Sequence, residues 1–330
     1  MTNSVQAGLA VGIASDGGPS RERNEDFAGS YLAASGALIA VADGMGGHQA
    51  GDVASRLLVE SLLARFAASS GRLQDRLLTA LEQANLEVFQ ASRQAGHRGM
   101  GATLVVVALE GNVALIASAG DARAYLLRGG ALTPLTRDHS WVAEQHRLGL
   151  LATQELRLHQ WRHVVSNAAG GFPQLKIDLK GVLLRPFDRL ILCSDGLTSV
   201  LEEAELAVAD QAPPEQAARA LLRSALERSP QDNVTVAVVA LGGEPRPSLA
   251  ITLPDWKGES PQPLRSWRRS TPPPSRSERA WSYATLLVLY AMLFALLLRG
   301  PDEEFSELAG IALLILLLLW RLLIRRRTRR

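Results

Sequence analysis

Short apolar runs, each ended by a tight polar turn, restrict the fold of the first 241 residues more than any other feature. The runs span residues 36–43, 102–109, 112–120, 123–127, 189–194 and 233–241. Runs of this length bounded by Gly, Asn or Asp are typical of β-strands. Glu110, Gly111 and Asn112 separate two runs by the length of a hairpin loop, so we expect antiparallel sheets.

Longer stretches beside these runs have the periodicity of helices. The apolar stripes are Val53, Leu57, Leu58, Ser61 and Leu62 in residues 50–68, and Leu77, Leu81, Ala84 and Val88 in residues 73–93. Shorter helices are predicted over residues 140–148, 202–211 and 214–228. Strand clusters with helix pairs beside them predict a layered α+β domain over residues 1–241.

The chain changes character after Leu241. Residues 242–280 are rich in Pro, Ser and Arg, which predicts an extended linker. Residues 281–298 contain no charge and are long enough to cross a bilayer. A short acidic loop, 299–307, leads to a second apolar run, 308–324, and to a basic tail, 325–330.

Two long apolar runs joined by one short loop predict a transmembrane helical hairpin rather than a buried hairpin of a globular domain. Trp281, Tyr283 and Trp320 lie at run ends, where aromatic side chains gather at membrane interfaces. Arginines flank the hairpin on both sides while its loop is acidic, so the positive-inside rule places both chain ends in the cytoplasm. We therefore expect a two-span protein of the inner (cytoplasmic) membrane, with residues 1–241 on the cytoplasmic side. The loop is too small to bind most ligands, which favours anchoring over sensing.

The formal net charge of +2 conceals two opposite regions. Residues 256–330 carry 13 basic and 6 acidic residues, whereas residues 1–255 carry 22 basic and 27 acidic residues. No nucleic-acid partner is expected, and the basic excess instead favours contact of the C-terminal region with a lipid bilayer. A single cysteine, Cys193, excludes an internal disulfide framework and a cysteine zinc site. The N-terminal residues lack the pattern of a signal peptide.

Acidic residues next to Gly or Asn recur where the apolar runs end. They occur in the segments Arg21–Asp26, Asp43-Gly44, Gly120-Asp121, Asp138-His139, Asp195-Gly196 and Asp232-Asn233. One Asp-Gly pair is usually only a turn, but several converging carboxylates would repel one another. A hard divalent cation with oxygen ligands removes that repulsion, so the pattern predicts a metal site.

In chain order, the motifs R-x-x-N-E-D, V-A-D-G-M-G-G-H, G-A-T-L, A-G-D-A-R-A-Y, T-R-D-H-S, C-S-D-G-L and D-N-V-T resemble the protein phosphatase 2C family. These are metal-dependent serine/threonine protein phosphatases, and the similarity is to the bacterial branch. The resemblance covers about residues 11–241. It implies two antiparallel β-sheets packed as a sandwich with helices on both outer faces, and two Mn²⁺ or Mg²⁺ ions, with a third in bacterial members.

The resemblance also implies a role for each acidic residue. The implied metal ligands are Glu25, Asp26, Asp43, Gly44 (through its carbonyl), Asp121, Asp195 and Asp232. Asp43 would bridge two ions, and Asp195 and Asp232 would hold the first of them. Glu25 and Asp26 would act through metal-bound water, and Asp121 with Asp195 would form the third site.

Two further residues are assigned to catalysis. Arg21 would bind the substrate phosphate while a metal-bridging hydroxide attacks phosphorus in line, and Asn233 would support Asp232. Two roles are open to His48: it protonates the leaving oxygen, or it packs or caps the helix that follows. Asp138 and His139 are interpreted as structural, Arg123 as an ion-pair partner and Cys193 as a buried strand residue.

The segment 147–171 departs from the family pattern. It should form the flap beside the metal site, but it carries Ser166-Asn167-Ala168-Ala169-Gly170 where the family has T-R-x-L-G. The resemblance implies a phosphatase that acts on phosphoserine and phosphothreonine in proteins and opposes a Ser/Thr kinase, and the two apolar runs add the expectation that it is anchored in the membrane. The alternative is a membrane-tethered phosphoprotein-binding adaptor with weak catalysis, against which the complete set of acidic motifs argues.

Overall fold

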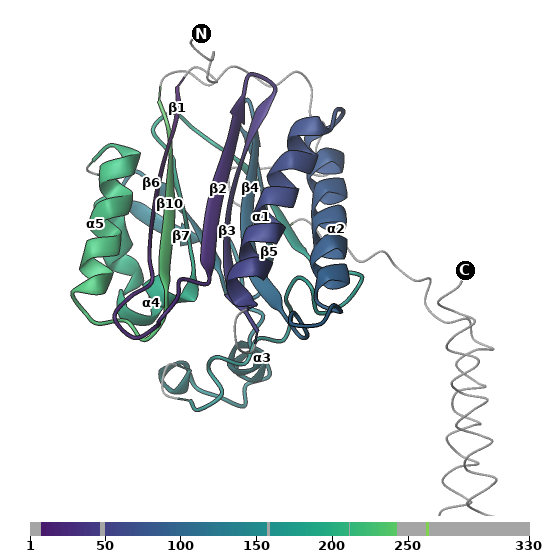
Figure 1. Ribbon diagram of the computed structural model, residues 1–330. Coiled ribbons are helices and arrows are strands. Elements are labelled where there is room, and N and C mark those ends of the chain that lie inside the picture. Colours follow the sequence, from purple (N-terminus) through teal and green to yellow (C-terminus); the bar gives the residue numbers. More distant parts are fainter. Residues whose placement is uncertain (1–7, 47–49, 157–158, 211, 243–261, 264–330) are drawn as a thin grey trace, which may run out of the picture. The chain divides into compact units, whose positions relative to one another are not determined.

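The computed structural model describes residues 8–46, 50–156, 159–210, 212–242 and 262–263 (Figure 1). Residue contacts divide the chain into two units, Met1–Trp267 and Arg268–Arg330, and every described residue belongs to the first. The predicted transmembrane runs, with the loop and tail that accompany them, lie outside the described residues. Within the described ranges, no helix combines the length and the apolar character needed to cross a membrane.

Two antiparallel sheets form the centre of the fold. The first has the order β1-β10-β9-β6-β7, with β1 (Leu9–Asp16), β10 (Val234–Leu241), β9 (Arg189–Cys193), β6 (Arg123–Arg128) and β7 (Ala131–Pro134). The second has the order β11-β8-β5-β4-β3-β2, with β11 (Gln262–Pro263), β8 (Asp178–Leu183), β5 (Val113–Ala119), β4 (Gly101–Glu110), β3 (Gly36–Met45) and β2 (Asp26–Ala33). The predicted hairpin is confirmed, because Glu110 of β4 pairs with Val113 of β5.

Helices cover both outer faces of this sandwich (Figure 1). On the second sheet lie α1 (Gly51–Ala68) and α2 (Leu73–Ala91). On the first sheet lie α4 (Asp195–Val200), the 3₁₀ segment η2 (Glu203–Asp210) and α5 (Pro214–Leu226). The short helix α3 (Trp141–Arg147) and the 3₁₀ turn η1 (Thr153–Glu155) belong to the segment beyond one end of the strands. The expected sandwich with outer helices is therefore confirmed.

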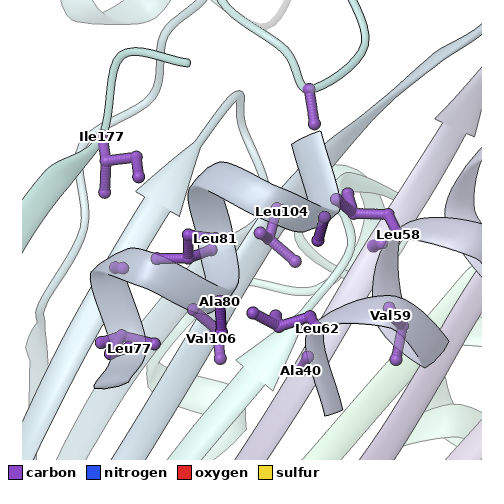
Figure 2. Packing of buried hydrophobic residues seen from close by; sticks show 14 of the residues in the cluster. Ala40, Leu58, Val59, Leu62, Leu77, Ala80, Leu81, Leu104, Val106 and Ile177 are labelled. Atoms are coloured by element: carbon purple, nitrogen blue, oxygen red, sulfur yellow. The ribbon is translucent and has the colours of Figure 1, made fainter. Parts of the chain in front are cut away.

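Alternation along the central strands explains their continuous apolar sequences. In β3, Ile39 and Val41 pack between the two sheets, whereas Leu38 and Ala40 face the helices. A strand buried on both faces needs apolar side chains at every position, which is why β3, β4 and β5 have few polar residues. Figure 2 shows the helix-facing layer, with Leu58 of α1 and Leu81 of α2 directed toward the sheet.

Two details differ from the sequence-based expectations. In α1, Val53 and Leu57 are only partly buried while Val59 and Phe66 are fully buried, because the helix packs against both β3 and α2. The stripe predicted for α2 is confirmed. Residues 202–211 were expected to form an α-helix, but the structure has the 3₁₀ segment η2 there, over Glu203–Asp210.

Part of the predicted linker pairs with the sheet. Gln262 and Pro263 form β11 and lie opposite Gly181 and Lys180 of β8. Proline is tolerated on an edge strand, where its missing N–H need not complete a ladder.

Candidate metal centre

The carboxylates that the sequence singled out meet at one end of the sandwich. Asp26 at the start of β2 lies directly opposite Asp43 near the end of β3. Ser194, which precedes α4, donates a hydrogen bond from Oγ to Asp26 Oδ2 at 2.7 Å. The antiparallel register of β2 and β3 therefore places the two acids side by side. The bond from Ser194, which follows β9, connects the first sheet to this pair.

Burial and mutual repulsion raise the pKa values of this group. Burial, followed by the charges of Asp26 and Asp195, holds the pKa of Asp43 well above its usual value. Burial raises the pKa of Asp26 to about 7, and burial with the charge of Asp195 raises the pKa of Asp121 to about 8. The pKa of Asp195 is raised by burial and then by Asp232. Ionisation of all these carboxyls is unfavourable in free energy unless a cation binds among them.

The same group has unsatisfied oxygen atoms. Asp26 Oδ1 and Asp195 Oδ1 are buried, and no described residue forms a hydrogen bond with either atom. Buried polar atoms are normally paired, and carboxylate oxygens are the ligands that Mg²⁺ and Mn²⁺ prefer, so the residues fit a divalent cation. No three His, Cys, Asp or Glu side chains in the described part of the chain stand close enough together to form a complete metal cluster. The set is therefore defined by shared burial and charge rather than by coordination geometry.

Glycines allow α1 to begin against this group. A Cβ atom added to Gly44 would lie 2.0 Å from the carbonyl oxygen of Gly51. One added to Gly51 would lie 2.6 Å from the Glu25 carboxyl carbon, and Gly44 N–H donates to Glu25 O at 3.0 Å. Only glycine permits this close approach. Burial also raises the pKa of Glu25.

Arg21 and Asn233 complete the rim. Arg21 Nη2 lies 2.8 Å from Asp232 Oδ2, and its side chain is 48% exposed. The backbone N–H of Asn233 donates to Asp232 Oδ1 at 2.9 Å, and the side-chain Oδ1 of Asn233 accepts from the backbone N–H of Glu25 at 2.8 Å. Asn233 Nδ2 donates to the carbonyls of Gly17 and Arg23. One amide side chain therefore joins the end of β1, the Arg21–Asp26 segment and the start of β10.

His139 supports the turn that carries Asp121. Its Nδ1 accepts from Gly120 N–H at 3.1 Å, and its backbone N–H donates to Gly120 O at 2.8 Å. This pattern assigns the proton to Nε2, which lies 3.1 Å from Asp178 Oδ2. Asn167 Nδ2 also lies 3.1 Å from Nδ1. The hydrogen bond from His139 is the main cause that lowers the pKa of Asp178.

The contacts of His139 were not predicted from the sequence, whereas the roles of Arg123 and Cys193 were. Nothing in the spacing of Asn167 or Asp178 indicates a contact with His139, because the three come from separate segments. Arg123 forms the expected ion pair, with Nε and Nη2 at 2.9 and 2.6 Å from the two Asp138 oxygens. Cys193 is fully buried in β9, as predicted. His48 lies outside the described residues.

Of the predicted flap, 147–171, the structure describes all but residues 157 and 158. Its end is fixed to the second sheet, because Ala169 and Ala102 of β4 exchange backbone hydrogen bonds of 2.8 and 3.0 Å. Asn167, which replaces a residue of the family motif, thereby lies next to His139. The departure from the pattern falls on a residue that contacts the support of the Asp121 turn.

Known proteins share this fold and sequence. Residues 19–233 match the family model described as protein phosphatase 2C. Protein phosphatase PhpP of Streptococcus pneumoniae is 32% identical over 243 residues, which cover 72% of this chain and 99% of PhpP.

Solved structures give the same result. The serine/threonine phosphatase PstP/Ppp of Mycobacterium tuberculosis is 33% identical, with a TM-score of 0.66 over 72% of this chain and 100% of that one. A PstP catalytic domain in complex with two manganese ions is 31% identical, with a TM-score of 0.65 over 72% and 99% of the two chains. The chain therefore belongs to the protein phosphatase 2C family and is a bacterial-type serine/threonine protein phosphatase that uses Mn²⁺ or Mg²⁺ and acts on phosphorylated proteins.

Proposed function

We propose that this phosphatase is anchored in the cytoplasmic membrane and hydrolyses phosphoserine and phosphothreonine in proteins modified by a Ser/Thr kinase. The observation that carries its metal-dependent chemistry is the buried carboxylate group at the sheet ends. Burial, and after it the repulsion from neighbouring carboxylates, raises the pKa values of Asp26, Asp43 and Asp121, and two oxygens of the group have no hydrogen-bond partner among the described residues. Such a group gains most from divalent cations.

The metal ligands in this proposal follow the positions of the carboxylates. Asp43 would be shared by two ions, because it lies within the electrostatic reach of four other aspartates, and the Gly44 carbonyl would add a ligand; the four are Asp26, Asp121, Asp195 and Asp232. The remaining ligands are Asp195 and Asp232 for the first ion, Glu25 and Asp26 through water, and Asp121 with Asp195 for a third. When bound, the ions lower the pKa of a water molecule for in-line attack and neutralise phosphate charge.

Arg21 binds the phosphate in this mechanism. Its half-exposed guanidinium donates from Nη2 to Asp232 and from Nε to the Gln231 carbonyl, which leaves the Nη1 N–H groups to donate to phosphate oxygens. Asp232 thus both orients the arginine and belongs to the metal set. His48 is proposed as the proton donor to the leaving serine or threonine oxygen, and this role rests on its place in the sequence.

A phosphatase assay on the full-length chain tests the mechanism. A phosphothreonine peptide should be hydrolysed with Mn²⁺ and not with EDTA, and both Asp43→Asn and Asp195→Asn should abolish turnover. Glu60→Gln is a matched control, because Glu60 is exposed on α1 and pairs only with Arg56. Turnover without metal, or full turnover in both variants, would contradict the mechanism. A binding-only adaptor would bind the peptide without turnover.

The membrane proposal is supported by the uncharged run 281–298, the second run 308–324 and the arginines outside both. A reporter fused after Arg330 should be active in the cytoplasm, and the protein should fractionate with membranes. A periplasmic signal from that fusion would refute the two-span topology. For the kinase relationship, deletion of the phosphatase should raise phosphothreonine on proteins that lose it when a Ser/Thr kinase is deleted.

A further inference from the structure

A cleft of about 430 Å³ lies between β7, α3 and η2, next to the carboxylate group. Its charged and titratable lining residues are Arg123, Arg137, Asp138, His146, Arg147 and Glu203. The remaining lining residues are small or apolar. The cleft shares no lining residue with the carboxylate group, so its occupant would differ from the metal ions.

A short stretch of chain connects the cleft with the carboxylate group. The chain leaves Asp121 and reaches Arg123 two residues later, so the two residues lie on either side of one turn. Asp138 bonds to Arg123 within the cleft, and its charge also helps to raise the pKa of Asp121. A polypeptide bound with its phosphate at the carboxylate group therefore lies within reach of the cleft.

The charges of the cleft are unevenly satisfied. Arg123 is held by both oxygens of Asp138, and its Nη1 lies 4.0 Å from Glu203 Oε1, which also accepts from Tyr125. Its charge is thus matched within the protein and is not available to a ligand.

Arg147 and Arg137 are held less firmly. Arg147 reaches only the Asp138 carbonyl at 3.4 Å and Glu144 at 3.8 Å, both in exposed positions. Arg137 is exposed, and within the described residues it has no hydrogen bond or ion pair. Asp178 already interacts with His139, which is the main cause that lowers its pKa, and the charges of both arginines lower that pKa further.

We propose that this cleft is an accessory subsite that binds an anionic side chain of the phosphoprotein substrate. The proposal rests on the proposed function, because the phosphate at the carboxylate group places the substrate. The anionic group is a carboxylate or a second phosphate, a few residues from the phosphoserine or phosphothreonine. Arg137 and Arg147 supply the forked N–H donors that bind such groups. The phosphatase then prefers acidic or multiply phosphorylated sequences.

Paired peptides test the subsite on the full-length, Mn²⁺-loaded chain. A phosphothreonine peptide carries Glu, phosphoserine or Ala at each position on either side of the phosphothreonine in turn. At the best position we expect kcat/KM to be about tenfold higher with an anion than with Ala, as for one charge-assisted contact. In the double variant Arg137→Gln/Arg147→Gln this ratio should fall to about 1 to 2, since the contact is lost. A ratio cancels any general loss of folding or chemistry.

Arg219→Gln is the matched control, because Arg219 is an exposed arginine of α5 that pairs with Glu215. It should keep the wild-type ratio. A larger ratio for phosphoserine than for Glu assigns the subsite to a second phosphate, and equal ratios assign it to either anion. Equal kcat/KM for acidic and neutral peptides in the wild type, or an unchanged ratio in the double variant, overturns the subsite. If the wild type shows no Mn²⁺-dependent turnover of p-nitrophenyl phosphate, the proposed function itself is overturned instead.

Discussion

Aspartates with buried carboxyl oxygens occur at both ends of β9, but only one of the two forms an ion pair among the described residues. Asp188 precedes β9 and is 2% exposed, yet both its oxygens accept hydrogen bonds from Arg128, at 2.9 and 2.6 Å. The backbone N–H of Arg185 adds a third bond. Asp195 follows the same strand, and there burial and the charge of Asp232 raise its pKa, while its Oδ1 has no hydrogen-bond partner among the described residues.

The difference separates an aspartate that stabilises the fold from one that binds a ligand. An arginine placed at the Asp195 end would satisfy the charge and would also occupy the place of the ions. Leaving that charge unmatched lowers the stability of the metal-free protein and keeps the group ready for cations. The two ends of β9 should therefore respond in opposite ways to substitution.

Asp43→Asn should have the largest effect. Turnover of a phosphothreonine peptide should fall at least about 10³-fold, since a central ligand and its charge are lost. In EDTA the variant should nevertheless be more stable than the wild type by about 1–2 kcal/mol, because one repelling carboxylate is gone. Activity assays and urea unfolding in EDTA measure the two effects. A metal-free variant less stable than the wild type would break the comparison.

Arg128→Gln should act at the other end. It leaves Asp188 buried without its cation, which should lower the free energy of unfolding by about 3 kcal/mol, the lower part of the range because Arg128 is partly exposed. Addition of Asp188→Asn should recover part of the loss, as expected for residues in contact. Urea unfolding checks both variants. A loss that is equal with and without Mn²⁺ shows that this end is independent of metal.

The pH dependence of stability should distinguish the metal-free from the loaded protein. The pKa of Asp26 is raised to about 7 and that of Asp121 to about 8, so between roughly pH 4 and 8 the folded chain binds more protons than the unfolded chain. The free energy of unfolding in EDTA should thus decrease as pH rises through this range, by up to about 1.4 kcal/mol per unit and group. Saturating Mn²⁺ should remove the decrease. Stability that increases with pH in EDTA would contradict the repulsion.

Substitution of His139 should give the smallest effect. It tests whether the hydrogen bonds of an imidazole position Asp121 at the carboxylate end. His139→Asn retains an acceptor near Nδ1 for the Gly120 N–H, whereas His139→Gln retains a donor near Nε2 for Asp178. If His139 positions Asp121, the Gln variant should need about tenfold more Mn²⁺ than the wild type for half-activation. The increase in the Asn variant should be smaller. Metal titrations of both variants measure this. Equal shifts in the two variants would reduce His139 to a packing role.

The sequence indicated the interior of the fold better than its edges. Strands β3, β4, β9 and β10 were evident because burial on both faces requires unbroken apolar runs. The strands β1, β2, β7 and β8 escaped prediction because they are shorter or mixed with glycine and polar residues, as in DFAGSYLA and DLKGVL. The edge strands β1, β2 and β7 need one apolar face at most, so they leave a weaker pattern, whereas β8 lies between β5 and β11 and its apolar run is interrupted by Lys180 and Gly181.

The site was predictable where chemistry follows strand ends. Asp43 and Asp195 stand next to glycines in short motifs, so their residue types and order carry the information. The contacts of His139 with Asn167 and Asp178, and the cleft beside Arg137, depend on how distant segments pack. That packing is set by tertiary contacts and has no local signal in the sequence.

Asn233 also fixes when a newly made chain can become active. Its amide holds Glu25 across 208 residues, and β10, which it precedes, is inserted between β1 and β9. At ribosomal speeds of about 5–20 residues per second, those residues take about 10–40 s to synthesise. Until then the carboxylates that come early in the chain, such as Glu25 and Asp26, lack both Asn233 and Asp232. A nascent or prematurely terminated chain is thus inactive, and the enzyme becomes competent only after translation has passed β10, which ends at Leu241.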